Sequence, residues 1–319
     1  MTNNNISEAA QIIKDGGLVA FPTETVYGLG ANALNPFAVA KIFEAKERPS
    51  FDPLIVHIAS FDDLNILSKG INENVIRLAK HFWPGPLTIV LPKSSVVPDI
   101  VTSGLNTVGI RMPDNPIALE LIKQAGCPIA APSANKFGLL SPVNAKHVRK
   151  QLPGIGYVLD GGNTRVGIES TIIAIDGHTC QLLRPGIITI SDIEKAFPDT
   201  FVFNNSKPDK LVSPGLLKSH YSPRKPLYFL DNRLDFPEFS GLILHCETNT
   251  CYNAQRVIYT SRTRDKIEIT ANLFASLHAM EEDDSIKNIF IEPVEETGLG
   301  IAIMDRLKKA AYRYNDRMD

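Results

Sequence analysis

One stretch of turn-forming residues interrupts an otherwise regular alternation of short apolar runs and helical patterns, and it divides the chain into two unequal parts. Residues 201–226 contain Asn-Asn-Ser-Lys-Pro-Asp, Ser-Pro-Gly and Ser-Pro-Arg-Lys-Pro, which are typical of turns and linkers rather than of a packed core. With 319 residues the chain also exceeds the usual size of a single hydrophobic core. We therefore predict a first domain over 1–200, a linker over 201–226 and a smaller second domain over 227–319.

The first 200 residues alternate strand-like and helix-like patterns, which predicts an α/β domain with a large mixed sheet. Apolar residues between 6 and 13 recur at helical spacing, and Gly16-Gly17 follows as a stop signal. After the next apolar run, the hydroxyls and glycines of 23–30 predict a turn that could carry a site. The predicted strands are 18–22, 54–58, 87–91, 108–111, 129–131, 157–160 and 170–175, and the predicted helices are 6–14, 36–47, 71–82, 116–125 and 143–151.

The residues after the linker repeat this alternation on a smaller scale. Apolar runs of strand length alternate with two longer helical patterns, an arrangement typical of parallel strands joined by helices. We therefore predict a small α/β domain with a parallel sheet. Its strands are expected at 227–230, 242–245, 257–259 and 288–291, and its helices at 271–280 and 301–314.

Composition and charge exclude several classes of protein. Hydrophobic residues make up 44% and charged residues 21% of the chain, which is the ordinary globular range. The net charge of −2 gives no basic excess for a phosphate backbone, so no stable direct nucleic-acid binding is expected. The N-terminus has no signal-peptide pattern, no apolar run reaches the roughly 18 residues that span a bilayer, and the cysteines form no CxxC pair. We expect a cytoplasmic protein with no membrane contact and with reduced, mostly buried thiols.

A pair of cations follows the second predicted helix. Lys46 and Arg48 precede a rigid turn at Pro49, where a compact charge and a planar fork could hold a polyphosphate. The alternative is a solvated helix end that is stabilised by cations at its C-terminus. His57, at the end of the next predicted strand, is either a substrate ligand or a packed histidine.

Further candidate clusters follow predicted strands. Arg111 ends a strand and is suited to a two-point clamp on a carboxylate, although a strand-end arginine is also an ordinary surface charge. The turn at 131–135, with Ser141 after it, offers small residues and hydroxyls that let a ligand approach the backbone; the alternative is a plain Ser/Asn turn. The glycines between 161 and 167 could face a phosphate, but neither a P-loop nor a GxGxxG fingerprint is present.

Taken in order, the motifs of the first domain resemble those of one known family. They are Pro22-Thr-Glu-Thr-Val-Tyr-Gly-Leu-Gly30, Lys46-x-Arg48-Pro49, Pro53-Leu-Ile-Val-His57, Trp83-Pro-Gly-Pro-Leu-Thr88, Gly109-Ile-Arg111-Met-Pro113, Pro132-Ser-Ala-Asn135 and Ser170-Thr171. This series is similar to that of the YrdC/Sua5 family. The segments 213–215, 220–223, 298–300 and 305–307 further resemble its two-domain Sua5 branch.

The resemblance implies a fold and a reaction. The fold is a YrdC-like twisted mixed sheet with helices around a central cavity, followed by a small Rossmann-like C-terminal domain. The reaction condenses L-threonine, bicarbonate and ATP to threonylcarbamoyl-AMP and pyrophosphate, with Mg²⁺ accompanying the nucleotide and no tightly bound organic cofactor. A downstream transferase complex then delivers the threonylcarbamoyl group to a tRNA adenosine, which becomes threonylcarbamoyladenosine.

The resemblance also implies residue roles. Lys46 and Arg48 would be the catalytic residues, since they compensate charge as a carbamate attacks the α-phosphorus. No protein metal site is implied. L-Threonine would contact Thr25, His57, Arg111, Ala131 and Thr171, with Arg111 on its carboxylate. ATP would contact Lys46, Arg48, Asp52, Thr107, Ser133, Asn135, Ser141 and Arg184, with Tyr221 reaching in from the linker.

Departures from the family pattern and other functions stay open at this point. Position 52 is Asp where many relatives carry Asn, and residues 216–219 lack the aromatic and basic pattern expected in the linker. A double-stranded RNA or tRNA-binding module of the same fold is the alternative function, which the low net charge disfavours. A carbamoyl-transferase component like the YrdC-like segment of hydrogenase maturation proteins is a third, but their acylphosphatase and zinc-finger modules are not found in this sequence.

Overall fold

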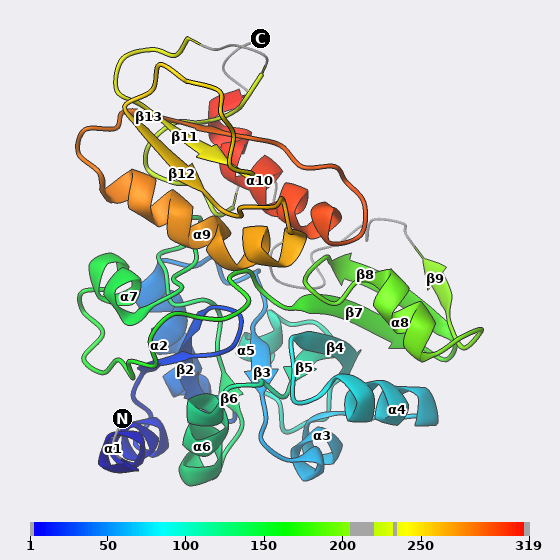
Figure 1. Ribbon diagram of the computed structural model, residues 1–319. Coiled ribbons are helices and arrows are strands. Elements are labelled where there is room, and N and C mark those ends of the chain that lie inside the picture. Colours follow the sequence, from blue (N-terminus) through cyan, green and yellow to red (C-terminus); the bar gives the residue numbers. More distant parts are fainter. Residues whose placement is uncertain (1–2, 205–219, 232–234, 316–319) are drawn as a thin grey trace.

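A nine-stranded mixed sheet dominates the computed structural model, which describes residues 3–204, 220–231 and 235–315 (Figure 1). Its strands are β1 (Val19–Pro22), β2 (Tyr27–Asn32), β3 (Ile55–His57), β4 (Leu87–Pro92), β5 (Thr107–Arg111), β6 (Ile129–Ala130), β7 (Thr171–Asp176), β8 (Thr179–Arg184) and β9 (Val202–Asn204). They lie in the order β1-β2-β6-β3-β5-β4-β7-β8-β9, with parallel pairs such as β3 and β5 beside antiparallel ones. The predicted large mixed sheet is confirmed.

Six of the eight helices described in this domain begin after a side chain that caps them. Asn35 and Asn115 each accept hydrogen bonds from the first turn of a helix whose first residue is proline. Gly126 ends α6 in the left-handed conformation that glycine adopts without strain. The helices are α1 (Asn3–Lys14), α2 (Pro36–Lys46), α3 (Phe61–Leu67), α4 (Glu73–Phe82), α5 (Asp99–Thr102), α6 (Pro116–Ala125), α7 (Ala145–Gln151) and α8 (Ile190–Ala196).

The two faces of the sheet are used differently. Side chains alternate along a strand, so Val56 points to the face opposite to that of its neighbours Ile55 and His57. Val56 belongs to the main hydrophobic core, together with apolar residues of α2, α3, α4 and α8. On the other face, α1 and α6 pack over the β1 end only. Further along that face, Ile55 packs with Val90, Ile172 and Leu183, and Ile55 and His57 line a cavity.

The second domain is a four-stranded sheet with two long helices, as predicted. Its strands β10 (Leu227–Phe229), β11 (Ser240–Leu244), β12 (Arg256–Tyr259) and β13 (Asn288–Ile291) are all parallel and lie in the order β10-β13-β11-β12. In Figure 1, α9 (Lys266–Glu282) lies between this sheet and the first domain. Helix α10 (Leu299–Asn315) lies beside the sheet.

The two domains share a hydrophobic cluster. It joins Val26, Leu140 and Val166 of the first domain to Leu273 of α9 and Leu307 of α10. The backbones also approach closely, because a side chain at Gly167 would meet the carbonyl oxygens of residues 270 and 271 at 2.5 Å. The second domain is therefore packed directly against the loops of the first.

Two sequence predictions differ from the structure. Residues 157–160, predicted as a strand, contain an isolated bridge between Val158 and Ala20 and no strand. Residues 27–30, the second half of the turn predicted at 23–30, belong instead to β2 (Tyr27–Asn32). The glycines that suggested a turn allow close packing, because a side chain at Gly30 would meet Phe21 and Ile129 at 2.7 Å.

The predicted domain boundaries stay a prediction. The larger sheet ends at Asn204, and the smaller one begins at Leu227. Residues 205–219 of the predicted linker, including 213–215 and 216–219, lie outside the described residues. Within the described part of the chain, no helix is long and apolar enough to cross a membrane. All four cysteines are free, but Cys180 alone is buried, so the expectation of mostly buried thiols is wrong.

Candidate active site

A cavity lies against the face of the large sheet that carries His57. It draws its walls from β3, β5, the turn at 131–135, the segment before β7, the end of β8 and residues 220–221. Eight of the residues predicted for the site line it: Thr25, Arg48, His57, Arg111, Ala131, Ser133, Arg184 and Tyr221. The structure thus brings together residues that are almost 200 positions apart in the sequence.

The strand register explains why His57 and Arg111 meet. In the parallel pair of β3 and β5, His57 pairs with Arg111 and Ile55 pairs with Gly109. The side chains of His57 and Arg111 therefore stand next to each other on the same face. Gly109 leaves space between β5 and the side chains of the neighbouring strand β4. A Cβ atom at position 109 would lie 3.3 Å from the Thr88 methyl group.

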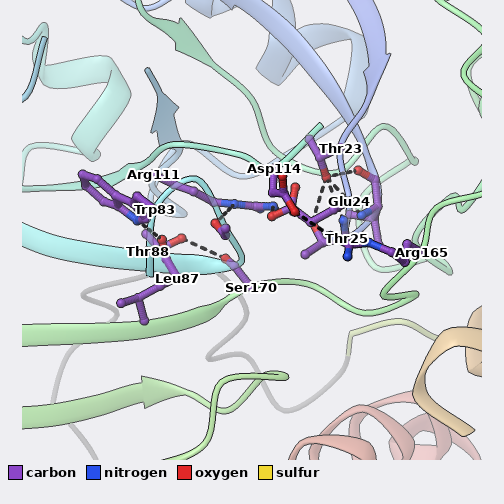
Figure 2. A network of polar contacts seen from close by, with 12 residues as sticks. Thr23, Glu24, Thr25, Trp83, Leu87, Thr88, Arg111, Asp114, Arg165 and Ser170 are labelled. Carbon is purple, nitrogen blue, oxygen red and sulfur yellow. Dashed lines mark hydrogen bonds and ion pairs between the residues drawn. The ribbon is translucent and has the colours of Figure 1, made fainter. Parts of the chain in front are cut away.

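A buried carboxylate holds Arg111 in place. The Arg111 Nη2 atom lies 2.6 Å from Glu24 Oε1 and donates to Thr25 Oγ1 at 3.1 Å, while its Nε donates to the carbonyl of Gly85 at 3.3 Å (Figure 2). Arg111 and Glu24 are 3% and 2% exposed. This group, Glu24, Thr25, His57 and Arg111, is called the Arg111 end of the cavity below.

His57 is neutral at the Arg111 end. Burial, and next the positive charge of Arg111, lower the pKa of His57 to about 3. The ring makes an edge contact with Phe21, and its Nδ1 atom is buried without a hydrogen-bond partner in the described residues. A neutral ring with an unused polar atom suits contact with a substrate better than it suits a purely packed histidine.

Three charged residues cluster at another part of the cavity, where Arg48 lines the wall and Lys46 and Asp52 lie behind it. Arg48 pairs with Asp52 at 2.9 Å and also donates to the carbonyls of Asp52 and Pro53. The Lys46 Nζ atom donates to the carbonyls of Ser133 (2.5 Å) and Asn135. Lys46, Arg48 and Asp52 are called the Lys46 end below.

Burial shapes the charges at the Lys46 end. It lowers the pKa of Lys46 well below its usual value, with the charge of Arg48 as the next cause. It likewise lowers the pKa of Arg48 and raises that of Asp52. Desolvated cations of this kind gain most from a new anionic partner.

The turn at 131–135 connects Lys46 to the cavity. Ala131 and Ser133 line the cavity, while Lys46 lies behind the turn and holds its backbone. Asn135 closes the following loop, because its Nδ2 atom donates to the carbonyls of residues 136 and 139. The glycine-free turn thus presents a hydroxyl and backbone groups to the cavity.

Arg184 also lines the cavity. Its guanidinium donates to the carbonyl and the hydroxyl of Ser170 at 3.1 and 3.2 Å, and that hydroxyl also bonds Thr88. Arg184 is within electrostatic reach of both Asp52 and Arg111. Within the described ranges, no carboxylate forms an ion pair with Arg184 or with Lys46.

Sequence reasoning missed one charged residue of the cavity wall, Glu169, and two charged residues behind the wall, Glu24 and Arg306. Glu24 and Glu169 each hold a network together, and Arg306 of α10 bonds Glu169 at 2.8 Å. Ser141 donates to the other oxygen of Glu169, so this predicted site residue lies behind the wall. The family motifs contained Glu24 and Arg306, but only the folded chain identifies their partners.

Residues 220 and 221 close one side of the cavity. His220 and Tyr221 both line it and are buried, and the Tyr221 hydroxyl has no hydrogen-bond partner in the described residues. Burial lowers the pKa of His220 to about 3 and raises the pKa of Tyr221. Both side chains are therefore uncharged at neutral pH.

Six predicted site residues do not line the cavity. Thr171 exchanges hydrogen bonds with Ile188. Thr107 is the first residue of β5 and is half-buried. It lies two residues before Gly109, which pairs with Ile55. The others are Lys46, Asp52, Asn135 and Ser141, which contact residues of the wall.

The chain is similar to known proteins over nearly its whole length. A family model described as "Telomere recombination" matches residues 11–186, and one described as "Threonylcarbamoyl-AMP synthase, C-terminal domain" matches residues 188–312. A threonylcarbamoyl-AMP synthase from Pyrococcus abyssi is 46% identical over 95% of this chain and 93% of its own length. One from Bacillus subtilis is 42% identical over 96% of this chain and 92% of its own.

A solved structure gives the same result. The crystal structure of P. abyssi Sua5 complexed with L-threonine matches with a TM-score of 0.87 at 43% identity, and the match covers 96% of this chain and 94% of that one. Both domains are therefore included in the match. The chain belongs to the YrdC/Sua5 family and, within it, to the two-domain Sua5-type threonylcarbamoyl-AMP synthases, the ATP-using enzymes of threonylcarbamoyladenosine synthesis.

Proposed function

We propose that the cavity binds L-threonine at its Arg111 end and ATP at its Lys46 end, and joins them through bicarbonate into threonylcarbamoyl-AMP. The observation that carries the proposal is the placement of two unlike charge clusters in one cavity. Arg111 is compensated by Glu24, whereas three cations, Lys46, Arg48 and Arg184, stand near two carboxylates, those of Asp52 and Glu169. The L-threonine complex of the P. abyssi relative supports the assignment of the first ligand.

At the Arg111 end, the guanidinium binds the carboxylate of threonine. Glu24 and the carbonyl of Gly85 fix the direction of the fork. Thr25, neutral His57 and the Ala131 methyl group form the remaining contacts. Thr171, whose hydroxyl bonds Ile188, acts at this end through the backbone around it.

At the Lys46 end, cations and the 131–135 turn receive the triphosphate. Lys46 and Arg48 supply positive charge, and Ser133 and Asn135 supply polar groups from the turn that Lys46 holds. Arg184, Asp52, Thr107, Ser141 and Tyr221 complete the nucleotide side of the proposal.

The chemistry then requires positioning rather than a covalent nucleophile. The threonine amine and bicarbonate form a carbamate with loss of water. A carbamate oxygen attacks the α-phosphorus of ATP, the bond to the β-phosphate oxygen breaks, and pyrophosphate leaves. Lys46 and Arg48 compensate the negative charge that develops on the phosphate, and residues 220–221 keep water from the labile carbamate.

Mg²⁺ fits as a companion of ATP. The described residues contain no cluster of three or more His, Cys, Asp or Glu side chains able to hold a metal. Mg²⁺ is commonly held by substrate phosphates, waters and one or two carboxylates, and Asp52 is a carboxylate at the Lys46 end. When bound, the ion neutralises charge on the departing pyrophosphate.

The cellular setting follows from the product. A downstream transferase complex takes threonylcarbamoyl-AMP to tRNA, and the cytoplasm supplies ATP and tRNA together. The RNA-binding alternative has no observation in its favour. Lys46, Arg48, Arg111 and Arg184 are each at most 8% exposed, and a duplex backbone needs exposed cations.

A pyrophosphate assay tests the proposal. Purified protein with ATP, Mg²⁺, bicarbonate and L-threonine is expected to release pyrophosphate and to form threonylcarbamoyl-AMP. Omission of threonine or of bicarbonate is expected to abolish both. Equal pyrophosphate release without threonine would contradict the proposal.

A further inference from the structure

An arginine of the second domain reaches the wall of the cavity. Arg306, on α10, is 0% exposed, and its Nε atom donates to Glu169 Oε2 at 2.8 Å. Its Nη1 atom bonds Asp305 at 2.6 Å, and the guanidinium lies 5.2 Å from the centre of the Tyr221 ring. This is a direct polar contact between the C-terminal domain and a residue that lines the cavity.

Glu169 is held from two sides. Ser141 donates to its Oε1 atom and Arg306 to its Oε2 atom. Burial alone would raise the pKa of this carboxyl, but Arg306 and Arg184 together bring it to about 2. Glu169 is therefore a carboxylate at neutral pH, and it needs a cation beside it.

Ser170, the residue that follows Glu169 in the chain, accepts hydrogen bonds from Arg184. Ser170 offers its carbonyl and its hydroxyl to the Arg184 guanidinium, and Arg184 has no ion-pair partner in the described residues. Two buried arginines thus stand near one carboxylate, and only Arg306 is bonded to it. Arg184 keeps its charge available to the cavity.

We propose that Arg306 is a positioning residue for ATP: it holds the Glu169 carboxylate toward the second domain and so leaves the Arg184 guanidinium available to the triphosphate. The inference rests on the function proposed above. It gives the C-terminal domain a part in nucleotide binding that does not require this domain to touch the nucleotide.

The physical reason is charge compensation in a desolvated place. Without Arg306, Glu169 is an uncompensated buried carboxylate, and Arg184 is the cation that can turn toward it. An Arg184 paired with Glu169 would lose attraction for phosphate. The threonine carboxylate, bound by Arg111 with its own partner Glu24, would be affected much less.

The test compares Arg306→Met with the double variant Arg306→Met/Glu169→Gln. Methionine keeps apolar contact with Tyr221 but removes the charge. Arg306→Met is expected to raise KM for ATP about tenfold or more and to change KM for threonine by less than about twofold. The double variant has no uncompensated carboxylate, so it is expected to recover most of the loss in KM for ATP.

Other outcomes overturn the inference. An unchanged KM for ATP, equal rises in both KM values, or a double variant no better than the single one would each do so. Arg256→Met is the control, because Arg256 forms an ion pair of the same length, 2.8 Å, with Asp283 within the second domain, in a more exposed place and with no residue that lines the cavity. It is expected to change neither KM.

A folding failure of Arg306→Met leaves a second comparison. Arg306→Lys keeps the charge, so its KM for ATP is expected to stay within about threefold of the wild type, and a rise above about tenfold would overturn the inference. Wild-type protein without threonine-dependent pyrophosphate release would instead refute the proposed function, which separates the two failures.

Discussion

The two ends of the cavity treat their cations in opposite ways. At the Arg111 end, the guanidinium pairs with Glu24 at 2.6 Å, and the neighbouring His57 is neutral. At the Lys46 end, three cations, Lys46, Arg48 and the nearby Arg184, face the carboxylates of Asp52 and Glu169, and Glu169 is already bonded to Arg306. The first end is close to electrically neutral, and the second has an excess of positive charge.

This difference matches the two proposed ligands. Threonine is a zwitterion, so a fixed pair of opposite charges can meet its carboxylate and its amino group without a net charge. ATP carries several negative charges close together, and it is met by cations that have few carboxylates of their own. Charge compensation therefore separates the amino-acid end from the nucleotide end.

The largest effect is expected from Arg111→Ala. The variant removes the carboxylate clamp and leaves Glu24 as an unpaired buried charge, so we expect a loss of about 2 to 4 kcal/mol in threonine use. Steady-state kinetics with each substrate varied in turn would measure this as a large rise in KM for threonine. Equal rises in KM for threonine and ATP would remove the distinction between the ends.

Lys46→Ala is expected to act at the Lys46 end. Loss of Lys46 removes a cation and frees the carbonyls of Ser133 and Asn135, so we expect about 1.5 to 3 kcal/mol less favourable use of ATP. Titration calorimetry with threonine should still detect binding in this variant. Unchanged ATP kinetics would refute the assignment of Lys46.

Glu24→Gln removes the negative charge that compensates Arg111 but keeps the Arg111 guanidinium. It therefore tests whether charge compensation distinguishes the two ends. It leaves Arg111 with a neutral partner, and we expect threonine use to weaken by about 1 to 2 kcal/mol while ATP use is unchanged. Asp99→Asn is the matched control, because Asp99 pairs with Lys93 but its side chain is 85% exposed. Tighter binding of threonine by Glu24→Gln would show that compensation is not needed.

The smallest expected effect is a pH dependence of the free energy of unfolding that arises from His57. Its pKa is about 3 in the folded chain and roughly 6.5 when unfolded, so the unfolded chain alone binds this proton between those values. Stability is therefore lost as pH falls through 6.5. Between pH 7 and 5.5 the loss from His57 is about 1 kcal/mol.

Denaturant unfolding of wild type and His57→Gln at pH 7 and 5.5 measures this difference. The variant is expected to lose about 1 kcal/mol less over the same interval. The same loss in both proteins would mean that His57 is charged in the folded state.

The sequence predicted the parts of this site better than the connections between them. His57 and Arg111 could be placed at strand ends from local apolar patterns, and α6 was predicted with its observed bounds, because cap and stop residues mark it. That the two strands are parallel neighbours in register depends on long-range pairing, which no local pattern contains.

The compensating carboxylates were missed for the same reason. Glu24 lies in a segment interpreted as a turn, and Glu169 contacts a residue 137 positions away in the other domain. A carboxylate in a motif gives no sign of which cation it will pair with. Gly28 and Gly30 misled in another way, since glycine favours turns but here permits close packing within β2.

A crystal structure of the protein with L-threonine and a nonhydrolysable ATP analogue tests the central claim most directly. We expect the threonine carboxylate within hydrogen-bond distance of Arg111, and the triphosphate beside Lys46, Arg48 and Arg184. A triphosphate bound at the Glu24–Arg111 pair, or ligands outside the cavity, would contradict the account.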